Sequence, residues 1–148
     1  MIEVGSDAAS KEEAIKHAVD LLMIAGRTER PRMVEEAVWA REAMYSTGLG
    51  YGFAVPHCKT DAVSGPALAV LKLRQPVEWG SMDGRPVEVL MLLAVPLSET
   101  AGGGGTGHMK VFAKLARKLM HEEFRAKMMD AVDSRGIEAC LREELGIE

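Results

Sequence analysis

The chain has 148 residues, a length that suits one domain with its own hydrophobic core. Hydrophobic residues make up 47% of it and charged residues 27%, as in ordinary globular proteins. The formal net charge of -4 argues against non-specific binding to nucleic acid or to an anionic membrane surface, so no nucleic-acid partner is expected.

The sequence also indicates the compartment in which the protein works. No apolar run approaches the roughly 20 residues that a membrane helix needs, and the amino-terminal residues lack the segments of a signal peptide. Cys58 and Cys140 lie far apart, which fits free thiols in a reducing environment. We therefore expect a single cytoplasmic domain that spans residues 1–148.

The amino-terminal part predicts two helices. Ser10 and Glu13 have the spacing of a capping box, in which each side chain satisfies a backbone N–H of the other residue. Apolar residues then recur at helical spacing until Gly26, which is a natural stop. A second helix is predicted from Pro31, a favourable first-turn residue, to about Met44.

The middle of the chain predicts strands. Phe53 to Val55 is a short apolar run, and Ala67 to Leu73 is a longer one. Val87 to Val95 is almost entirely apolar, which is typical of a central strand that is buried on both faces. Pro76 to Asp83 is predicted to be a turn or a short edge strand.

The carboxyl-terminal part predicts three more helices after a glycine-rich tract, Gly102 to Gly105, that we interpret as a flexible connection. They run from His108 to about Met120, from Glu122 to Met129 and from Ser134 to Leu145. Helices at both ends of a strand-rich middle predict an α/β fold, with a mixed central β-sheet flanked by α-helices on both sides.

Arg41 lies within the apolar arc of the second predicted helix. The other members of this arc are Met33, Val34, Ala37, Val38 and Met44. Glu42 lies off the arc. An arginine in such a place either extends to the rim or meets an anion, and the helical geometry favours neither reading.

His108 is predicted on the inward face and in the first turn of its helix, in line with Val111 and Leu115. The helix dipole disfavours a charged imidazole there and favours a nearby anion, so a neutral ring could donate a hydrogen bond to phosphate. A core histidine that bonds to a carbonyl is the simpler alternative.

His57 follows a proline at the end of a short apolar run. Pro56 fixes the backbone just before the ring and disfavours a helical conformation at Val55. The imidazole is therefore carried at the terminus of a strand, a usual place for active groups in open α/β sheets. A neutral imidazole, with a reference pKa of about 6.5, is a competent nucleophile.

Other chemistries have little support. Cys58 is a poor nucleophile–base partner for His57, because neighbours on a strand point to opposite faces. The sequence contains no spaced set of the three or four ligands that zinc needs, and the glycine tract lacks the ending of a phosphate loop. His17 and His121 are predicted to be surface residues.

An ordered set of motifs runs through most of the chain. It consists of Arg41-Glu42-Ala43, Ser46-Thr47-Gly48-Leu49-Gly50, Ala54-Val55-Pro56-His57, Lys59-Thr60-Asp61-Ala62-Val63, Met82-Asp83-Gly84-Arg85-Pro86-Val87 and His108-Met109-Lys110-Val111-Phe112-Ala113-Lys114-Leu115-Ala116-Arg117. Together these motifs resemble the fructose/mannitol-type enzyme IIA domain of the bacterial phosphoenolpyruvate-dependent sugar phosphotransferase system.

The resemblance implies a phosphotransferase that works through phosphohistidine, without a cofactor or a metal. His57 would accept a phosphoryl group from the phosphocarrier protein HPr and pass it to a cysteine of the cognate enzyme IIB. Enzyme IIB would then phosphorylate the sugar during its uptake through the membrane component IIC. The resemblance also implies that His108 is a second active-site histidine and that Arg41 binds phosphate, and we expect a further hydroxyl contact from Thr47.

The sequence departs from the family pattern at two places. The tract from Ala101 to Gly107 is longer and richer in glycine, and Met44-Tyr45 stands where small or polar residues are usual. Two alternatives to a sugar-transport role are a regulatory, nitrogen-related enzyme IIA and a non-catalytic interaction domain. The stretch from Lys59 to Val63 resembles the sugar branch, and the two histidines with the arginine argue against a non-catalytic domain.

Overall fold

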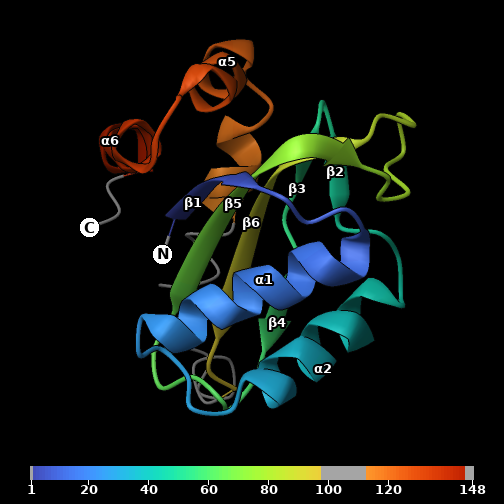
Figure 1. The fold of residues 1–148 in the computed structure, drawn as a ribbon, viewed down its shortest axis with the longest axis vertical. Coiled ribbons are helices and arrows are strands. Elements are labelled where there is room, and N and C mark those ends of the chain that lie inside the picture. Colours follow the sequence, from blue (N-terminus) through green and yellow to red (C-terminus); the bar gives the residue numbers. More distant parts are fainter. Residues whose placement is uncertain (1, 98–112, 146–148) are drawn as a thin grey trace.

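The computed structural model describes residues 2–97 and 113–145 of the chain. Its elements, labelled as in Figure 1, are β1 (Ile2–Ser6), α1 (Lys11–Ile24), α2 (Pro31–Glu42), β2 (Gly48–Gly50), β3 (Phe53–Ala54), β4 (His57–Lys59), β5 (Ala67–Val77), β6 (Val87–Val95), α5 (Glu122–Asp130) and α6 (Ser134–Leu145). Residues 113–118 are also helical.

The strands of the described residues form one mixed sheet. Their order is β1-β5-β6-β3-β2, and β4 pairs with β6 beyond β3. β5 and β6 are antiparallel, whereas β1 runs parallel to β5, and both β3 and β4 run parallel to β6. Strand β6 is therefore central.

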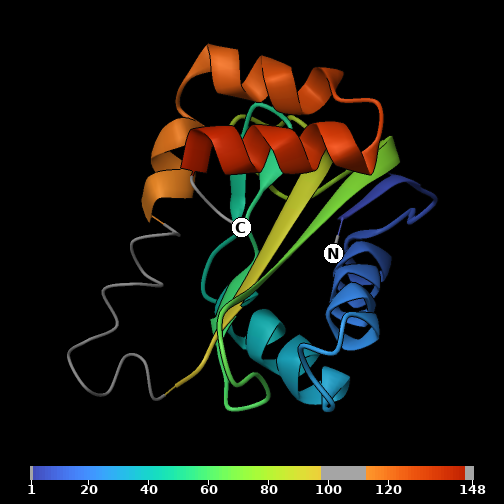
Figure 2. The same ribbon diagram turned by 90° about the vertical axis from the view of Figure 1, so that its left-hand side faces the viewer.

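Helices cover both faces of the sheet (Figure 2), as predicted. The core between the sheet and helices α1 and α2 includes Ile15, Val19, Leu22, Val34, Val38, Leu71, Leu90 and Leu92. The core on the opposite face includes Val70, Val89, Met91, Leu115, Phe124, Met128 and Ile137. Successive residues of β6 enter opposite cores, which explains why this strand is apolar throughout.

Several predicted elements are confirmed, with changes at their ends. Ser10 caps α1 and accepts from the Glu13 N–H at 3.1 Å, but the Glu13 carboxylate meets the Ser10 hydroxyl instead of its backbone N–H. β5 runs to Val77 and takes in the first two residues of the segment that was predicted to be a turn or a short edge strand. The predicted start of a helix at His108 lies outside the described residues, and β1 and β2 were not predicted.

The predicted orientation of the second helix was partly wrong. α2 ends at Glu42, and Met33 and Met44 are 36% and 73% exposed, whereas Glu42 is only 6% exposed. The buried line therefore runs through Val34, Val38 and Glu42 at a spacing of four residues. A carboxylate can stay on this line because Lys11 lies 2.8 Å from it, as an ion pair.

His17 was predicted to be a surface residue, but it is half-buried. Its Nε2 lies 2.9 Å from the Glu3 carboxylate, and its Nδ1 lies 3.2 Å from the Ser6 hydroxyl. The ring therefore ties α1 to β1, a strand that was not predicted. His121 is exposed, as predicted, and occupies the N-cap position of α5.

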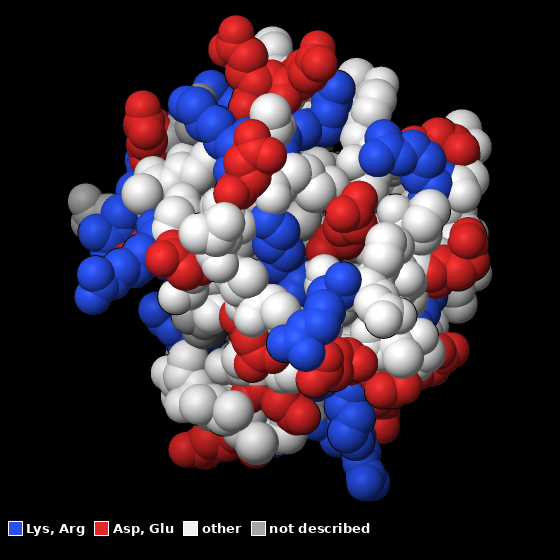
Figure 3. All heavy atoms as spheres, turned by 45° about the horizontal axis from the view of Figure 1, so that its top comes forward, with Lys and Arg blue, Asp and Glu red and all other residues white. Residues whose placement is uncertain are grey.

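One face of the molecule is mixed in charge. On the face drawn in Figure 3, lysine and arginine side chains are interspersed with aspartate and glutamate side chains. None of the helices in residues 2–97 and 113–145 has both the length and the apolar character that a bilayer crossing requires.

Lys72 offers a test of how helix α5 is attached to the sheet. Its ammonium group, on β5, donates to the carbonyls of Met128, Met129 and Ala131 at the end of α5. We expect Lys72→Met to lower the free energy of unfolding by about 1–3 kcal/mol, because the variant leaves carbonyls without their donor. Urea denaturation measures the change.

Arg74→Met is the matched control on the same strand. Arg74 pairs with Asp7 at 2.9 Å, but both side chains are largely exposed. Its loss should therefore change the free energy of unfolding by less than about 0.5 kcal/mol. Equal effects of the two substitutions would show that Lys72 does not hold α5.

Candidate functional site

The site begins at an interruption in the sheet. Along one edge of β6, β3 pairs at Val89 and Leu90, and β4 pairs from Leu93 onward. Pro56 lies between the two short strands, and it has no N–H for the ladder, although its carbonyl accepts from the Leu93 N–H at 3.0 Å. His57 therefore opens β4. The prediction that it ends a strand was wrong in this respect, because pairing resumes after the proline.

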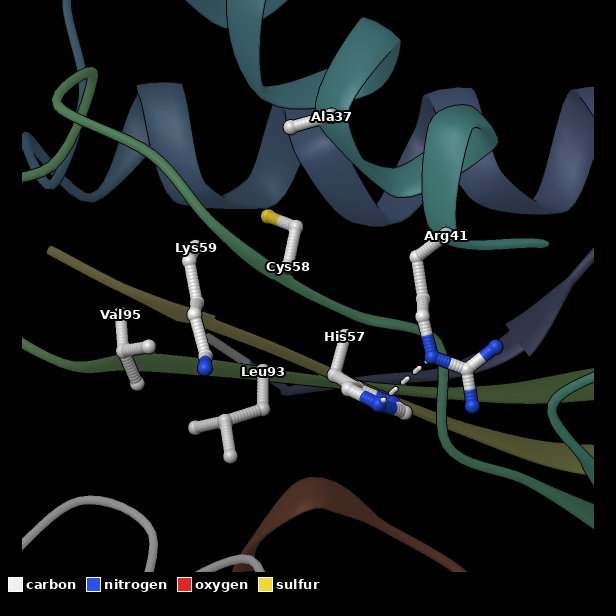
Figure 4. A pocket seen from close by; sticks show the side chains of 7 residues that line it. All are labelled: Ala37, Arg41, His57, Cys58, Lys59, Leu93 and Val95. Atoms are coloured by element: carbon white, nitrogen blue, oxygen red, sulfur yellow. Dashed lines mark hydrogen bonds between the residues drawn. The ribbon is translucent and has the colours of Figure 1, made fainter. Parts of the chain in front are cut away.

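Two hydrogen bonds fix the tautomer of His57. Its Nδ1 lies 2.9 Å from the carbonyl oxygen of Val55, which can only accept. Its Nε2 accepts from the Nε of Arg41 at 3.1 Å (Figure 4), and a guanidinium can only donate. The proton therefore sits on Nδ1, and Nε2 carries the lone pair.

The surroundings favour the neutral ring. Burial lowers the pKa of His57 below its ordinary value, and the carbonyl of Val55 acts in the opposite direction. The positive charge of Arg41 lowers the pKa further, the carboxylate of Glu42 raises it, and Lys59 lowers it. The result is a lowered pKa, so the ring is neutral and Nε2 is unprotonated at neutral pH.

Arg41 extends from the last turn of α2 to the rim of the site. Besides its contact with His57, its Nη1 donates to the carbonyl of Tyr45 at 3.1 Å, and its Cζ lies 4.0 Å from the centre of the Tyr45 ring. The half-buried guanidinium thus reaches an imidazole at the edge of the fold. The structure thus brings together two of the residues proposed for the site, Arg41 and His57.

A pocket of about 350 Å³ opens beside these two groups. Its described lining consists of Ala37, Arg41, His57, Cys58, Lys59, Leu93 and Val95 (Figure 4). His57 and Lys59 project to one side of β4, and the Cys58 side chain projects to the other, toward α2. Burial raises the pKa of the Cys58 thiol to about 12, so this group stays protonated and is no nucleophile.

The two remaining predicted site residues are placed differently. Thr47 is 4% exposed, and its hydroxyl donates to Glu42 and accepts from the indole N–H of Trp79. Thr47 is not among the described residues that line the pocket. Its contact with phosphate stays a prediction, which is disfavoured because the hydroxyl already bonds to Glu42 and Trp79. His108 lies outside the described residues.

Sequence reasoning missed two features of the site. Lys59 lies two residues after His57, and the alternation of a strand would have placed it on the same face. The stacking of Tyr45 on Arg41 had a weaker signal, a spacing of four residues that continues past the end of the helix.

Comparisons with known proteins agree with this geometry. A family profile described as "Phosphoenolpyruvate-dependent sugar phosphotransferase system, EIIA 2" matches residues 1–144. The chain is 34% identical to the fructose-specific EIIA component of the phosphotransferase system from Haloferax volcanii, over 97% of this chain and 90% of that protein. It is 40% identical over 97% of its length to multiphosphoryl transfer protein 2 of Escherichia coli, but spans only 16% of that protein.

A solved structure shows the same fold. The nitrogen regulatory protein IIA-Ntr from Neisseria meningitidis is 31% identical and matches with a TM-score of 0.82, over 95% of this chain and 92% of that one. The mixed sheet with helices is therefore confirmed, and so is the resemblance on which the site residues were proposed. The chain belongs to the EIIA 2 family of the phosphoenolpyruvate-dependent sugar phosphotransferase system, a family of phosphotransferases.

Proposed function

We propose that this chain is one cytoplasmic EIIA unit, which accepts a phosphoryl group from phospho-HPr on His57 and passes it to a cysteine of a cognate enzyme IIB. Enzyme IIB would use it during sugar uptake through a membrane component IIC. The observation that supports this most is the orientation of the His57 ring, whose Nε2 lone pair faces the guanidinium of Arg41.

The hydrogen bonds around His57 suit both halves of a relay. In the first half, Nε2 attacks phosphorus, the bond to the donor atom breaks, and its electron pair leaves with the donor. Positive charge that develops on the ring is shared with the Nδ1–H, which the carbonyl of Val55 holds at 2.9 Å. In the second half, the cysteine thiolate of enzyme IIB attacks, and the bond between phosphorus and Nε2 breaks.

Arg41 supplies the charge that the moving group needs. In the transition state of transfer, the phosphoryl group carries its negative charge on the equatorial oxygens. Catalysis of this step consists mainly of positioning and electrostatic stabilisation. The guanidinium lies 3.1 Å from the reacting nitrogen and occupies its lone pair, so Arg41 has to release Nε2 as phosphorus bonds there, and its N–H groups then remain beside the phosphoryl oxygens. We propose that His108 assists the transfer as a neutral donor; for Thr47 we propose a supporting role through Glu42 in place of the predicted phosphate contact.

The sugar class is also a proposal. A fructose/mannitol-class role is supported by the 34% identity to a fructose-specific EIIA component that this chain nearly covers. A regulatory role is the second candidate, because the nitrogen regulatory protein IIA-Ntr is 31% identical and shares the fold. The residues after Pro56-His57 are Cys58 and Lys59, whereas regulatory members usually have Gly-Arg, and this favours transport.

A reconstituted relay tests the proposed function. The chain is incubated with labelled phosphoenolpyruvate, enzyme I, HPr and candidate enzyme IIB proteins, and the label is followed onto each protein. Label on the chain and then on an enzyme IIB is the expected result. If the chain becomes labelled but transfers the label to none of the enzyme IIB proteins, the result would favour the regulatory candidate.

His57→Gln should take up no acid-labile phosphate, because the amide has no nucleophilic lone pair at the position of Nε2. Acid lability of the label on gels measures this outcome. His121→Gln, at an exposed helix cap, is the control and should be labelled at the unaltered rate. Undiminished labelling of His57→Gln would contradict the assignment.

Arg41→Met should slow phosphoryl transfer on the order of 10²-fold or more, as for the loss of one electrostatic stabiliser. Arg41→Lys should recover only part of the rate, because a point charge cannot reproduce a bidentate contact. Rapid-quench rates and melting temperatures measure both effects, and the methionine variant should stay folded. A variant that unfolds readily, and whose folded fraction transfers at full speed, would make Arg41 a structural residue.

The lowered pKa of His57 predicts a pH profile. The reactive neutral ring should persist as the pH falls through about 6.5, the ordinary pKa, and the rate should decline only below it. Because Arg41 contributes to the lowering, Arg41→Met should move the midpoint to higher pH. Labelling by the small donor phosphoramidate, with free imidazole as the reference nucleophile, measures both profiles. A midpoint at or above about 6.5, the ordinary pKa of a histidine side chain, would refute the prediction.

A further inference from the structure

Tyr45 contacts Arg41 twice, from two directions. Its ring lies against the guanidinium, 4.0 Å from Cζ to the ring centre, and its backbone carbonyl accepts from Nη1 at 3.1 Å. Tyr45 follows the last residue of α2 by three positions and is 66% exposed.

These two contacts determine which edge of the guanidinium meets His57. The group is planar, and Nε–H shares one edge with an N–H of Nη2, whereas Nη1 lies in the same plane on the side of Cζ away from that edge. The carbonyl of Tyr45 holds Nη1, and the ring of Tyr45 sets the plane. The edge of Nε and Nη2 is thereby presented to Nε2 of His57. Once Nε–H releases the lone pair to phosphorus, the same edge matches two oxygens of the phosphoryl group.

We propose that Tyr45 is a positioning residue, which holds Arg41 in the orientation that binds the phosphoryl group on His57. The proposal rests on the function proposed above for these two residues. An unsupported arginine at the end of a helix samples many rotamers, and each transfer would have to order it again. With Tyr45 in place, the guanidinium is ordered before the phosphoryl group arrives.

Two variants separate the ring from the rest of the residue. Tyr45→Leu keeps apolar bulk and the backbone carbonyl but removes the aromatic face, and Tyr45→Phe keeps the face. Since the side chain is largely exposed, both variants should fold, which the melting temperature checks.

The first measurement needs no phosphoryl transfer. The pKa of His57 is read from its ring C–H signals in NMR spectra recorded across a pH range, with the unphosphorylated protein alone. Because Arg41 contributes to the lowered pKa of His57, release of the guanidinium should raise this pKa in Tyr45→Leu. Tyr45→Phe should leave it at the value of the unaltered protein.

The second measurement uses phosphoramidate in place of a partner protein. The phosphorus–nitrogen bond of the donor breaks, ammonia leaves with its electron pair, and phosphorus bonds to Nε2 of His57. Tyr45→Leu should be labelled roughly two- to fivefold more slowly, the factor that a cation–π contact at an exposed site supports. Tyr45→Phe should restore the rate.

Two controls make the result specific. Tyr51→Leu removes a similar stack, in which Cζ of Arg125 lies 3.8 Å from the ring centre outside the site, and should change neither the pKa of His57 nor the rate. In the background of Arg41→Met, Tyr45→Leu should have no further effect on either quantity, because it acts through the guanidinium.

The proposal is overturned if Tyr45→Leu leaves both quantities unchanged, or if its effect persists without Arg41. It is also overturned if this variant is slow with phospho-HPr only, which would make Tyr45 a contact for the partner. If even the unaltered protein takes up no phosphate, the proposed function fails, and the pKa measurement still decides whether Tyr45 orders Arg41.

Discussion

Strand β6 is the constraint on which the rest of the structure depends. Its nine residues, Val87–Val95, are almost all apolar and buried, so both of its faces and both of its edges have to be covered. Helices α1 and α2 cover one face, and the helices after residue 113 cover the other (Figure 2). β5 pairs along one edge, whereas two short strands share the second edge. The imidazole of His57 lies where Pro56 interrupts that second edge.

A buried charge network fixes the helix end from which Arg41 extends. The carboxylate of Glu42 accepts from Lys11 at 2.8 Å and from the N–H of Thr47 at 2.9 Å. The same lysine lies 5.2 Å from the ring centre of Trp79. A buried carboxylate is costly unless it is paired and hydrogen-bonded, and here it has both kinds of partner. The network joins α1, α2 and two loops directly behind the site.

Much of the fold could be predicted because its signals are local. The apolar run of β6, the Ser10 cap and the start of α2 at Pro31 each follow from a few neighbouring residues. β1 could not be predicted in the same way, because its pairing partner is β5, more than sixty residues away. The burial of the Glu42 side chain likewise depends on Lys11, which is remote in sequence.

The candidate site was predictable for the same reason, but only in part. Pro56 places His57 through backbone stereochemistry, and the period of a helix brings Arg41 to the face that meets it. Their hydrogen bond, however, requires α2 to lie alongside β4, and no local pattern encodes that packing. The tautomer of the ring and the stack on Tyr45 are consequences of this tertiary arrangement, and so they emerged only from the structure.

The burial of Cys58 has a consequence for the direction of phosphoryl flow. In the proposed relay the next acceptor is a thiolate on another protein, and Cys58 is a thiol on the residue directly after the donor imidazole. An ionised sulfur at that place would compete with the partner and trap the phosphoryl group within the chain. With its pKa raised to about 12 and its side chain turned toward α2, this thiol is kept out of the competition. The burial of Cys58 would thus prevent transfer of the phosphoryl group from His57 to a thiol of the same chain in the proposed relay.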